Sequence, residues 1–237
     1  MVDFEWTLRG SCYLLGDDIP HADGVIPQRF IIDRETDPDV LKHHLFELTD
    51  PGFVSRCKPG DIIVAGRNFG VGQKSTGYIA MKALGLGLIC DSIPTQGYRG
   101  AIYAGLRVLA HCRGVTSMCS SGDDIEVNFS SGLFTNHTRG LKEIWRPMPQ
   151  SLQDLISTGG GEAWLSTWWS TVAPAEKNDT GASQSLAFPQ ISRQIMMSKT
   201  EMEKRKCSAR NMPLSSKSRQ SSRSSTRGIR LSMKPNG

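Results

Sequence analysis

The sequence predicts an α/β domain with a partly parallel sheet, followed by a linker and a basic tail. Between residue 6 and about residue 165, short apolar runs alternate with segments of helical pattern, as expected for strands that helices connect. Hydrophobic residues make up 38% of the 237 residues and charged residues 22%, so the chain can bury a sizeable core. The composition then changes, and residues 193–237 are rich in Ser, Lys and Arg.

The predicted elements follow from apolar pattern and from turn residues. Strands are expected at residues 6–15, 61–65, 86–90, 106–110, 125–129 and 141–145. Residues 61–65 give the clearest signal, because an apolar, β-branched run lies between Pro59-Gly60 and Gly66. Helices are expected at residues 38–48, 75–84, 95–105 and 151–157, the first with Asp37 as N-cap and Pro38 at its first position. Residues 131–133 resemble a hairpin turn.

Composition also predicts the domain boundaries. We expect a folded domain at residues 1–165, a linker at 166–192 and a disordered tail at 193–237. The tail holds 12 Lys/Arg and 2 Asp/Glu, so the net charge of +5 comes from it, and its few aliphatic residues cannot offset the entropy of ordering. A solvated tail is favoured over one that binds RNA or an acidic membrane. Trp164, Trp168 and Trp169 either close the edge of the core, which is favoured, or mark a contact surface.

The N-terminus and the cysteines predict an intracellular protein, cytoplasmic with a mitochondrial location left open. Residues 1–6 contain acids where a signal peptide would have basic and apolar residues. No apolar run approaches the roughly 20 residues of a membrane-spanning helix, so no membrane contact is expected. The six cysteines form no Cys-x-x-Cys pair and no zinc spacing with His. This chain by itself is therefore expected to bind no metal and no iron–sulfur cluster.

A glycine-rich segment at residues 66–80 is the most informative part of the chain. It follows the predicted strand 61–65 and opens a predicted helix, with Gly66, Gly70 and Gly72 free to form tight turns. Free N–H groups at a helix start, together with Lys74, favour a carboxylate or phosphate ligand. A purely structural turn fits the segment equally well. The glycine spacing matches no nucleotide-binding motif.

Two further segments carry polar residues at strand ends. Residues 16–27 place three carboxylates and a histidine in a turn, which fits acid–base chemistry or an ordinary turn, the latter being favoured. Residues 91–106 place Ser92, Tyr98 and Arg99 between a strand and a helix. If the strands are neighbours, these side chains lie close to the glycine-rich turn, where α/β sheets bind ligands.

These three segments, in this order and spacing, resemble the swivel domain of the aconitase superfamily, and most closely the small-subunit family of 3-isopropylmalate dehydratase. The family's first loop reads Gly-Asp-x-Ile-Asp-Thr-Asp-x-Ile-Ile-Pro. This chain has Gly16-Asp17-Asp18-Ile19 and then Val25-Ile26-Pro27, with one more residue between these two parts than the family has. The family's Gly-Asp-Ile-Ile-Val-Ala-Gly-x-Asn-Phe-Gly-Cys-Gly is matched by residues 60–72 except at Val71. The resemblance covers residues 6 to about 165.

The resemblance implies a swivelling β/β/α domain, with a disordered C-terminal tail, that works with a separate large subunit. In that family the large subunit holds a [4Fe–4S] cluster, whose open iron acts as a Lewis acid on the substrate hydroxyl. The swivel domain closes over it and supplies a Ser-Ser-Arg motif, with a serine base and an arginine for a substrate carboxylate. The implied substrate is a small hydroxy di- or tricarboxylic acid. The implied partner is an aconitase-type large subunit, and nucleic acid is not expected.

The chain departs from the family at this motif, because Gln73, Lys74 and Ser75 stand where Ser-Ser-Arg is expected. Three alternatives remain open. In the first, which is favoured, the site is rewired, with Lys74 holding a carboxylate and Ser75 acting as the base. In the second, the subunit has lost the chemistry and serves as a structural or regulatory partner. In the third, the fold serves an unrelated function.

The rewired alternative assigns a role to each candidate site residue. Ser75 and Asp17 are the expected catalytic residues, Ser75 as base and Asp17 orienting a group or accepting a proton. The expected substrate-binding residues lie in the glycine-rich turn and after the next strand: Asn68, Gly70, Gly72, Gln73, Lys74 and Arg99. Lysine does not replace arginine in a bidentate carboxylate clamp, so the substrate is expected to differ from 3-isopropylmalate.

Overall fold

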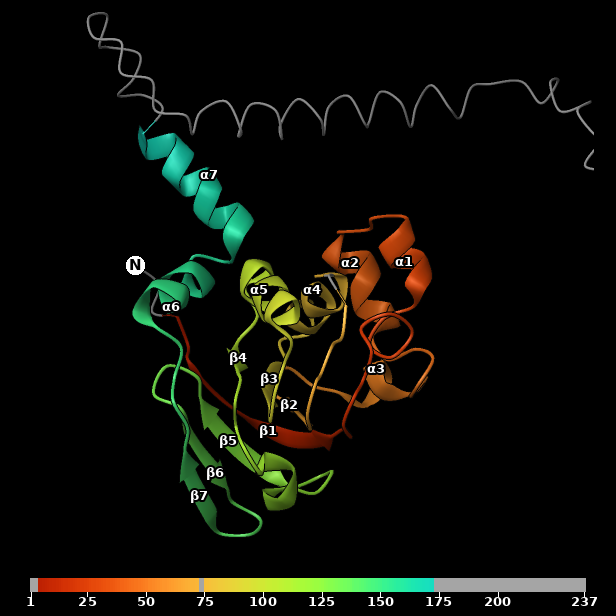
Figure 1. Cartoon of the computed structure of the whole chain (residues 1–237), viewed down its shortest axis with the longest axis vertical. Helices are drawn as coiled ribbons and strands as arrows, with labels where there is room; N and C mark the ends of the chain where they lie inside the picture. Colours follow the sequence, from red (N-terminus) through yellow and green to blue (C-terminus); the bar gives the residue numbers. More distant parts are fainter. Residues whose placement is uncertain (1–3, 73–74, 173–237) are drawn as a thin grey trace, which may run out of the picture. The chain divides into compact units, whose positions relative to one another are not determined.

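A computed structural model describes residues 4–72 and 75–172 of the chain (Figure 1). Seven strands form one sheet in the order β4-β3-β2-β1-β5-β6-β7. The strands are β1 (Thr7–Leu14), β2 (Ile62–Ala65), β3 (Gly87–Cys90), β4 (Val108–Leu109), β5 (Asp124–Asn128), β6 (Leu133–Asn136) and β7 (Leu141–Ile144). The six predicted strands are confirmed, with shorter bounds at several ends.

The sheet has a parallel half and an antiparallel half that meet at β1. β4, β3, β2 and β1 are parallel, with Cys12 of β1 opposite Ile62 of β2. β1, β5, β6 and β7 are antiparallel, with Gly10 of β1 opposite Ile125 of β5. Every residue of β2 and β3 is buried, as expected for parallel strands covered on both faces.

The sequence did not predict β6, although residues 131–133 indicated a hairpin. The hairpin turn lies there, and its second strand has a weak apolar pattern because Thr135 and Asn136 are both buried. The side-chain amide of Asn136 donates hydrogen bonds to the carbonyl oxygen of Met118 (2.9 Å) and to Oδ2 of Asp123 (2.8 Å). A buried polar residue with these partners is stable in a strand but gives no hydrophobic signal.

Most of the helices lie over the parallel half of the sheet, and the last one packs on other helices instead. The helices are α1 (Gln28–Ile32), α2 (Pro38–Leu41), η1 (Lys42–His44), α3 (Phe53–Arg56), α4 (Thr76–Ala83), α5 (Thr95–Ala104), η2 (Val115–Met118), α6 (Gln150–Ser157) and α7 (Gly161–Val172). Figure 1 shows α2, α4 and α5 on the same side of the sheet. The predictions for α4, α5 and α6 are confirmed within a few residues, whereas α1, α3 and α7 were not predicted.

The prediction of one helix over residues 38–48 is wrong in its extent. Asp37 does cap the helix, and its side chain accepts a hydrogen bond from the N–H of Asp39. The α-helix nevertheless ends at Leu41, and a 3-10 turn follows. Phe46 has a left-handed backbone (φ 56°), and its N–H donates to the carbonyl oxygen of Val25 at 2.8 Å. This bond to the first loop replaces a continued helix.

Two hydrophobic clusters cover the two faces of the sheet, because alternate residues of each strand point to opposite sides. Ile63 and Leu88 belong to the cluster beneath the helices, together with Tyr78 of α4. Ile62 and Ile89 belong to the other cluster, which contains Phe129 and Phe134. The carboxyl ends of the parallel strands therefore emerge from a core that is buried on both sides.

Helix α7 places its tryptophans outside this core. Trp164, Trp168 and Trp169 are 41%, 36% and 38% exposed, so the favoured prediction that they close the core edge is wrong. The helix includes residues 166–172, the beginning of the expected linker. The rest of that linker and the expected tail at 193–237 lie outside the described residues, and the domain boundaries stay predictions. In the described part of the chain, no helix has the length and apolar character to cross a membrane.

Candidate functional site

The first loop and the glycine-rich turn run side by side beyond the carboxyl ends of β1 and β2. Backbone hydrogen bonds join them from Asp18 N–H to Arg67 O (2.8 Å), from Gly70 N–H to Ile19 O (2.7 Å) and from His21 N–H to Val71 O (3.0 Å). The parallel pairing of β1 with β2 thus continues past both strands. The sequence analysis left open whether the strands that precede these segments are neighbours, and the structure shows that β2 lies between β1 and β3.

The segment after β3 joins the same place. The N–H of Phe69 donates to the carbonyl oxygen of Ser92 (3.0 Å), and the N–H of Asn68 donates to the Ser92 hydroxyl (2.8 Å). The side-chain amide of Asn68 donates to Oδ1 of Asp18 at 2.9 Å. Asn68 thereby ties all three predicted segments together. Arg99, further along the third segment, is exposed on α5 and does not line the pocket described below.

The turn requires glycine at two positions, because of the backbone conformation and, at one of them, because a side chain would not fit. Gly70 and Gly72 have φ values of 72° and 127°, a region that other residues rarely adopt. A Cβ on Gly70 would overlap the hydroxyl oxygen of Tyr78. Tyr78 is fully buried, and its hydroxyl has no hydrogen-bond partner among the described residues. Burial raises the pKa of this phenol, so Tyr78 stays neutral at physiological pH.

Arg67 donates three hydrogen bonds to the carboxylate of Asp17. Asp17 accepts hydrogen bonds from the backbone N–H of Arg67 (2.8 Å), from Nε (3.0 Å) and from Nη2 (2.7 Å). These bonds, first the one from the backbone, lower the pKa of Asp17 below its usual 3.8. A carboxylate with a lowered pKa is a weak proton acceptor at neutral pH. The geometry therefore favours the orienting role of Asp17 over proton transfer.

Sequence reasoning missed His21 as a site residue. His21 is fully buried, although it comes from a loop rich in Asp, Gly and Pro. Its Nε2 accepts a hydrogen bond from the N–H of Gly77 at 3.1 Å. Its ring packs edge-on against Tyr78, with 5.0 Å between the ring centroids. The available signal was a single histidine in the loop that follows the first predicted strand.

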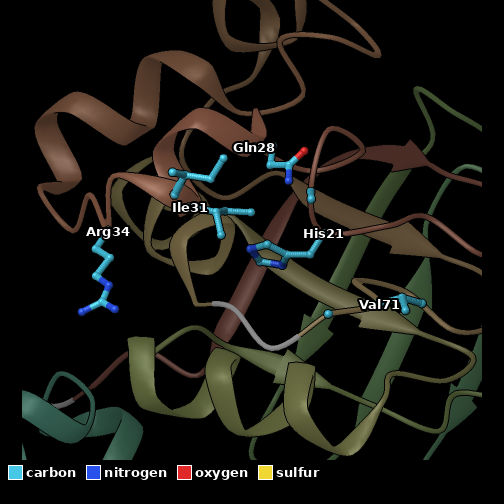
Figure 2. Close-up of a pocket in the computed structure, with 8 residues that line it drawn as sticks. His21, Gln28, Ile31, Arg34 and Val71 are labelled. Carbon is cyan, nitrogen blue, oxygen red and sulfur yellow. The ribbon is translucent and has the colours of Figure 1, made fainter. Parts of the chain in front are cut away.

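A pocket of about 370 Å³ opens beside His21 (Figure 2). Its apolar wall comes from α1 and the glycine-rich turn, and its polar groups are an imidazole, an amide and a guanidinium; the lining residues are His21, Ala22, Gln28, Ile31, Ile32, Arg34, Val71 and Gly72. Figure 2 shows Ile31 next to the His21 ring, with the guanidinium of Arg34 directed away from that ring. The volume falls in the range of small-molecule sites.

The start of α4 contacts one lining residue of this pocket, since the N–H of Gly77 donates to Nε2 of His21, but neither Ser75 nor any residue of α4 lines the pocket itself. Ser75 is the N-cap residue of α4 and is half-buried, and its side chain forms no capping hydrogen bond with the first turn, whose residues are all described. Gln73 and Lys74 lie outside the described residues. Among the predicted site residues that are described, Gly72 lines the pocket, and Asp17, Asn68 and Gly70 hold the adjoining turn in place.

The described residues offer no obvious metal centre. Nowhere within residues 4–72 and 75–172 do three or more His, Cys, Asp or Glu side chains gather in a way that could hold an ion. The described cysteines are free thiols, and Cys12, Cys90, Cys112 and Cys119 are buried. Cys207 lies outside the described residues.

Known proteins resemble this chain over about two thirds of its length. No family model matches it. The 3-isopropylmalate dehydratase small subunit of Thermodesulfovibrio yellowstonii is 36% identical over 159 residues, which are 66% of this chain and 92% of that protein. The 2,3-dimethylmalate dehydratase small subunit of Eubacterium barkeri is 37% identical over 154 residues, 64% of this chain and 92% of that protein.

A solved structure agrees with these relatives. The crystal structure of 3-isopropylmalate dehydratase from Methanocaldococcus jannaschii matches with a TM-score of 0.63 and 26% identity. The match covers 73% of this chain and 99% of that one. It confirms the expected α/β fold, and the relatives confirm the resemblance to dehydratase small subunits. The chain therefore belongs to the family of 3-isopropylmalate dehydratase small subunits, of the aconitase type.

Proposed function

We propose that this chain is the small subunit of an aconitase-type hydro-lyase, which isomerises a hydroxy acid by dehydration and rehydration. The observation that carries the proposal is the pocket beside the glycine-rich turn. Ile31, Ile32 and Val71 give it an apolar wall, and Arg34 supplies a cation at the same pocket. This combination suits a hydroxy di- or tricarboxylic acid that bears an alkyl group, such as an acid of the isopropylmalate type.

The proposal divides the chemistry between two chains. We assign a [4Fe–4S] cluster to an aconitase-type large subunit, because the described part of this chain has no ligand group for one. A cluster there supplies a Lewis acid for the substrate hydroxyl. This chain contributes the residues that hold the carboxylate and move the proton. A cytoplasmic location for the complex stays a prediction.

The roles of this chain's residues follow from the start of α4. Backbone N–H groups of the turn and the charge of Lys74 bind a substrate carboxylate at the positive end of the helix dipole. Ser75 is the proposed base, and its hydroxyl is not used to cap the helix. Asp17 orients the turn through Arg67. Asn68, Gln73 and Arg99 are the further proposed contacts around the substrate.

A catalytically silent subunit is the second candidate, and the altered motif favours it. Gln73, Lys74 and Ser75 replace the family's Ser-Ser-Arg, so the residue at the family's serine position cannot act as a base. In that case the chain would keep the fold and the partner but would contribute no proton acceptor.

Co-expression with an aconitase-type large subunit from the same genome tests both candidates. The complex is purified without oxygen, and the absorbance of the conjugated alkene is followed with 2-isopropylmalate and related hydroxy acids. An active dehydratase is expected to lose activity in Ser75→Ala and in Lys74→Ala. Lys142→Ala, on an exposed part of β7, is the matched control and should leave activity unchanged. A stable but inactive complex would support the silent subunit, and the absence of any complex would overturn both.

A further inference from the structure

The first turn of α4 is capped from another part of the chain. The first N–H groups of a helix have no partner within the helix, and the side chain of the N-cap residue usually accepts a hydrogen bond from the second or third of them. Ser75 is at the N-cap and has a favoured side chain for this role, yet it forms no such bond. The N–H of Gly77, at the second helical position, instead donates to Nε2 of His21 at 3.1 Å.

The packing around His21 is built for this bond. The ring is fully buried against Tyr78, and the backbone N–H of His21 is fixed to Val71 O. A Cβ on Gly77 would lie 2.5 Å from Cγ1 of Val25 and 3.3 Å from Nε2 of His21, so only glycine allows this approach without displacement. Since Nε2 accepts a hydrogen bond, it carries no proton, and a neutral ring has its proton on Nδ1.

We infer that His21 is a positioning residue, which caps α4 in place of Ser75 and thereby leaves the Ser75 hydroxyl available to the substrate. This inference rests on the proposed function, in which Ser75 is the base. If the Ser75 hydroxyl accepted a hydrogen bond from the N–H of Gly77, it would be held against the first turn of its own helix. His21 also lines the pocket together with Gly72, so the cap lies directly beside the proposed substrate.

A double-mutant cycle on the full chain, read by melting temperature, tests the cap without an activity assay. In the native background, Ser75→Ala should leave the melting temperature unchanged, because the serine is not a cap. In the His21→Leu background the Gly77 N–H loses its acceptor, and Ser75 is the nearest capping side chain in sequence. Ser75→Ala should then lower the melting temperature by a few degrees. Equal effects of Ser75→Ala in both backgrounds would overturn the inference.

Kinetics of the complex then test the consequence for the base. His21→Leu should lower kcat by about 10²-fold with little change in KM, because a misplaced base weakens the transition state alone. His21→Gln keeps an acceptor near the Nε2 position and should recover most of the lost kcat. His43→Leu removes an exposed histidine from η1 and is the matched control.

The pH dependence separates this role from a merely structural one. A proton on Nε2 prevents acceptance of the Gly77 N–H, so kcat should fall as His21 becomes protonated at low pH. Tyr78 faces the ring and stays neutral, Arg34 is the charged group at the same pocket, and Lys74 follows in the adjoining turn outside the described residues. In His21→Gln the acid limb attributed to His21 should disappear. An acid limb that stays unchanged in this variant would contradict the inference.

The two proposals fail in distinguishable ways. If the native complex is inactive with every acid, the proposed function fails, and the cycle with Ser75→Ala still decides whether His21 caps α4. The amide resonance of Gly77 gives a second readout on the full chain, since loss of the acceptor in His21→Leu should speed its hydrogen exchange. Unchanged exchange in that variant would overturn the cap even if the enzyme is active.

Discussion

The hydroxyl of Tyr78 should destabilise the folded chain, so Tyr78→Phe should increase the free energy of unfolding. The side chain is fully buried under the glycine-rich turn, and the described residues give its hydroxyl no hydrogen-bond partner. Burial of a hydroxyl without a partner costs about 1–3 kcal/mol. Removal of the oxygen leaves a void of roughly 10 Å³, which costs about 0.2 kcal/mol. The expected net gain is about 1–3 kcal/mol.

Urea unfolding followed by tryptophan fluorescence measures this gain. For a domain of this size, 1 kcal/mol corresponds to a rise of about 2–4 °C in the melting temperature. Tyr103→Phe is the matched control, because Tyr103 is 51% exposed and its substitution should change stability by less than about 0.5 kcal/mol. A loss of stability in Tyr78→Phe would show that the hydroxyl has a partner, and the reasoning would be refuted.

Gly70→Ala gives an independent check of the same contact. The new Cβ would overlap the Tyr78 hydroxyl, and alanine would have to adopt a φ of 72°. Overpacking and a left-handed backbone together should cost about 2–4 kcal/mol. In the Tyr78→Phe background the nearest ring atom is Cζ, 3.3 Å from that Cβ, so the cost should fall. Additive effects of the two substitutions would refute the predicted contact.

Three further predictions concern the site and the antiparallel half of the sheet. The pKa of the Asp17 carboxylate, measured by NMR, should lie below 3.8 and should return towards that value in Arg67→Ala. Because the pKa is lowered in the folded state, the stabilisation by this carboxylate is present at pH values above its usual pKa and is lost as the pH falls through its lowered pKa. Ile32→Arg, on an exposed part of the pocket wall, should shift the kcat/KM preference of an active complex from alkyl-substituted acids towards acids with an added carboxylate. If the ratio of the two kcat/KM values does not change, this wall does not determine substrate specificity. Asn136→Ala should cost about 2–4 kcal/mol in urea unfolding, because it removes the donor from the buried carboxylate of Asp123 and from the half-buried carbonyl of Met118. A smaller loss would mean that water replaces the amide.

Local sequence pattern predicted much of the sheet and little of the pocket. The buried strand at Ile62–Ala65 and the cap at Asp37 were predicted because each depends on residues adjacent in the chain. Strand β6 was missed because Asn136 is buried through its amide bonds and not through apolar character. Helix α1 is only five residues long, too short to show a helical period, yet it forms the apolar wall of the pocket.

The same limit applies to the candidate site. The glycine-rich turn was predicted from its glycines, and the structure shows positive φ values at Gly70 and Gly72 but not at Gly66. Asp17 was predicted as a site residue, but its engagement by Arg67 follows only from the adjacency of two loops. His21 was placed in an ordinary turn, although it is fully buried at the start of α4.

The sequence by itself determined the family, the positions of six strands along the chain and the glycine-rich turn at residues 66–72, because burial and turn chemistry leave local patterns in the chain. Tertiary structure alone decided which groups meet at that turn. Nε2 of His21 reaches the N–H of Gly77 across 56 residues, and Asp17 reaches Arg67 across 50. Such contacts depend on the parallel register of β1 and β2, and the periodicity of either segment contains no information about its partner.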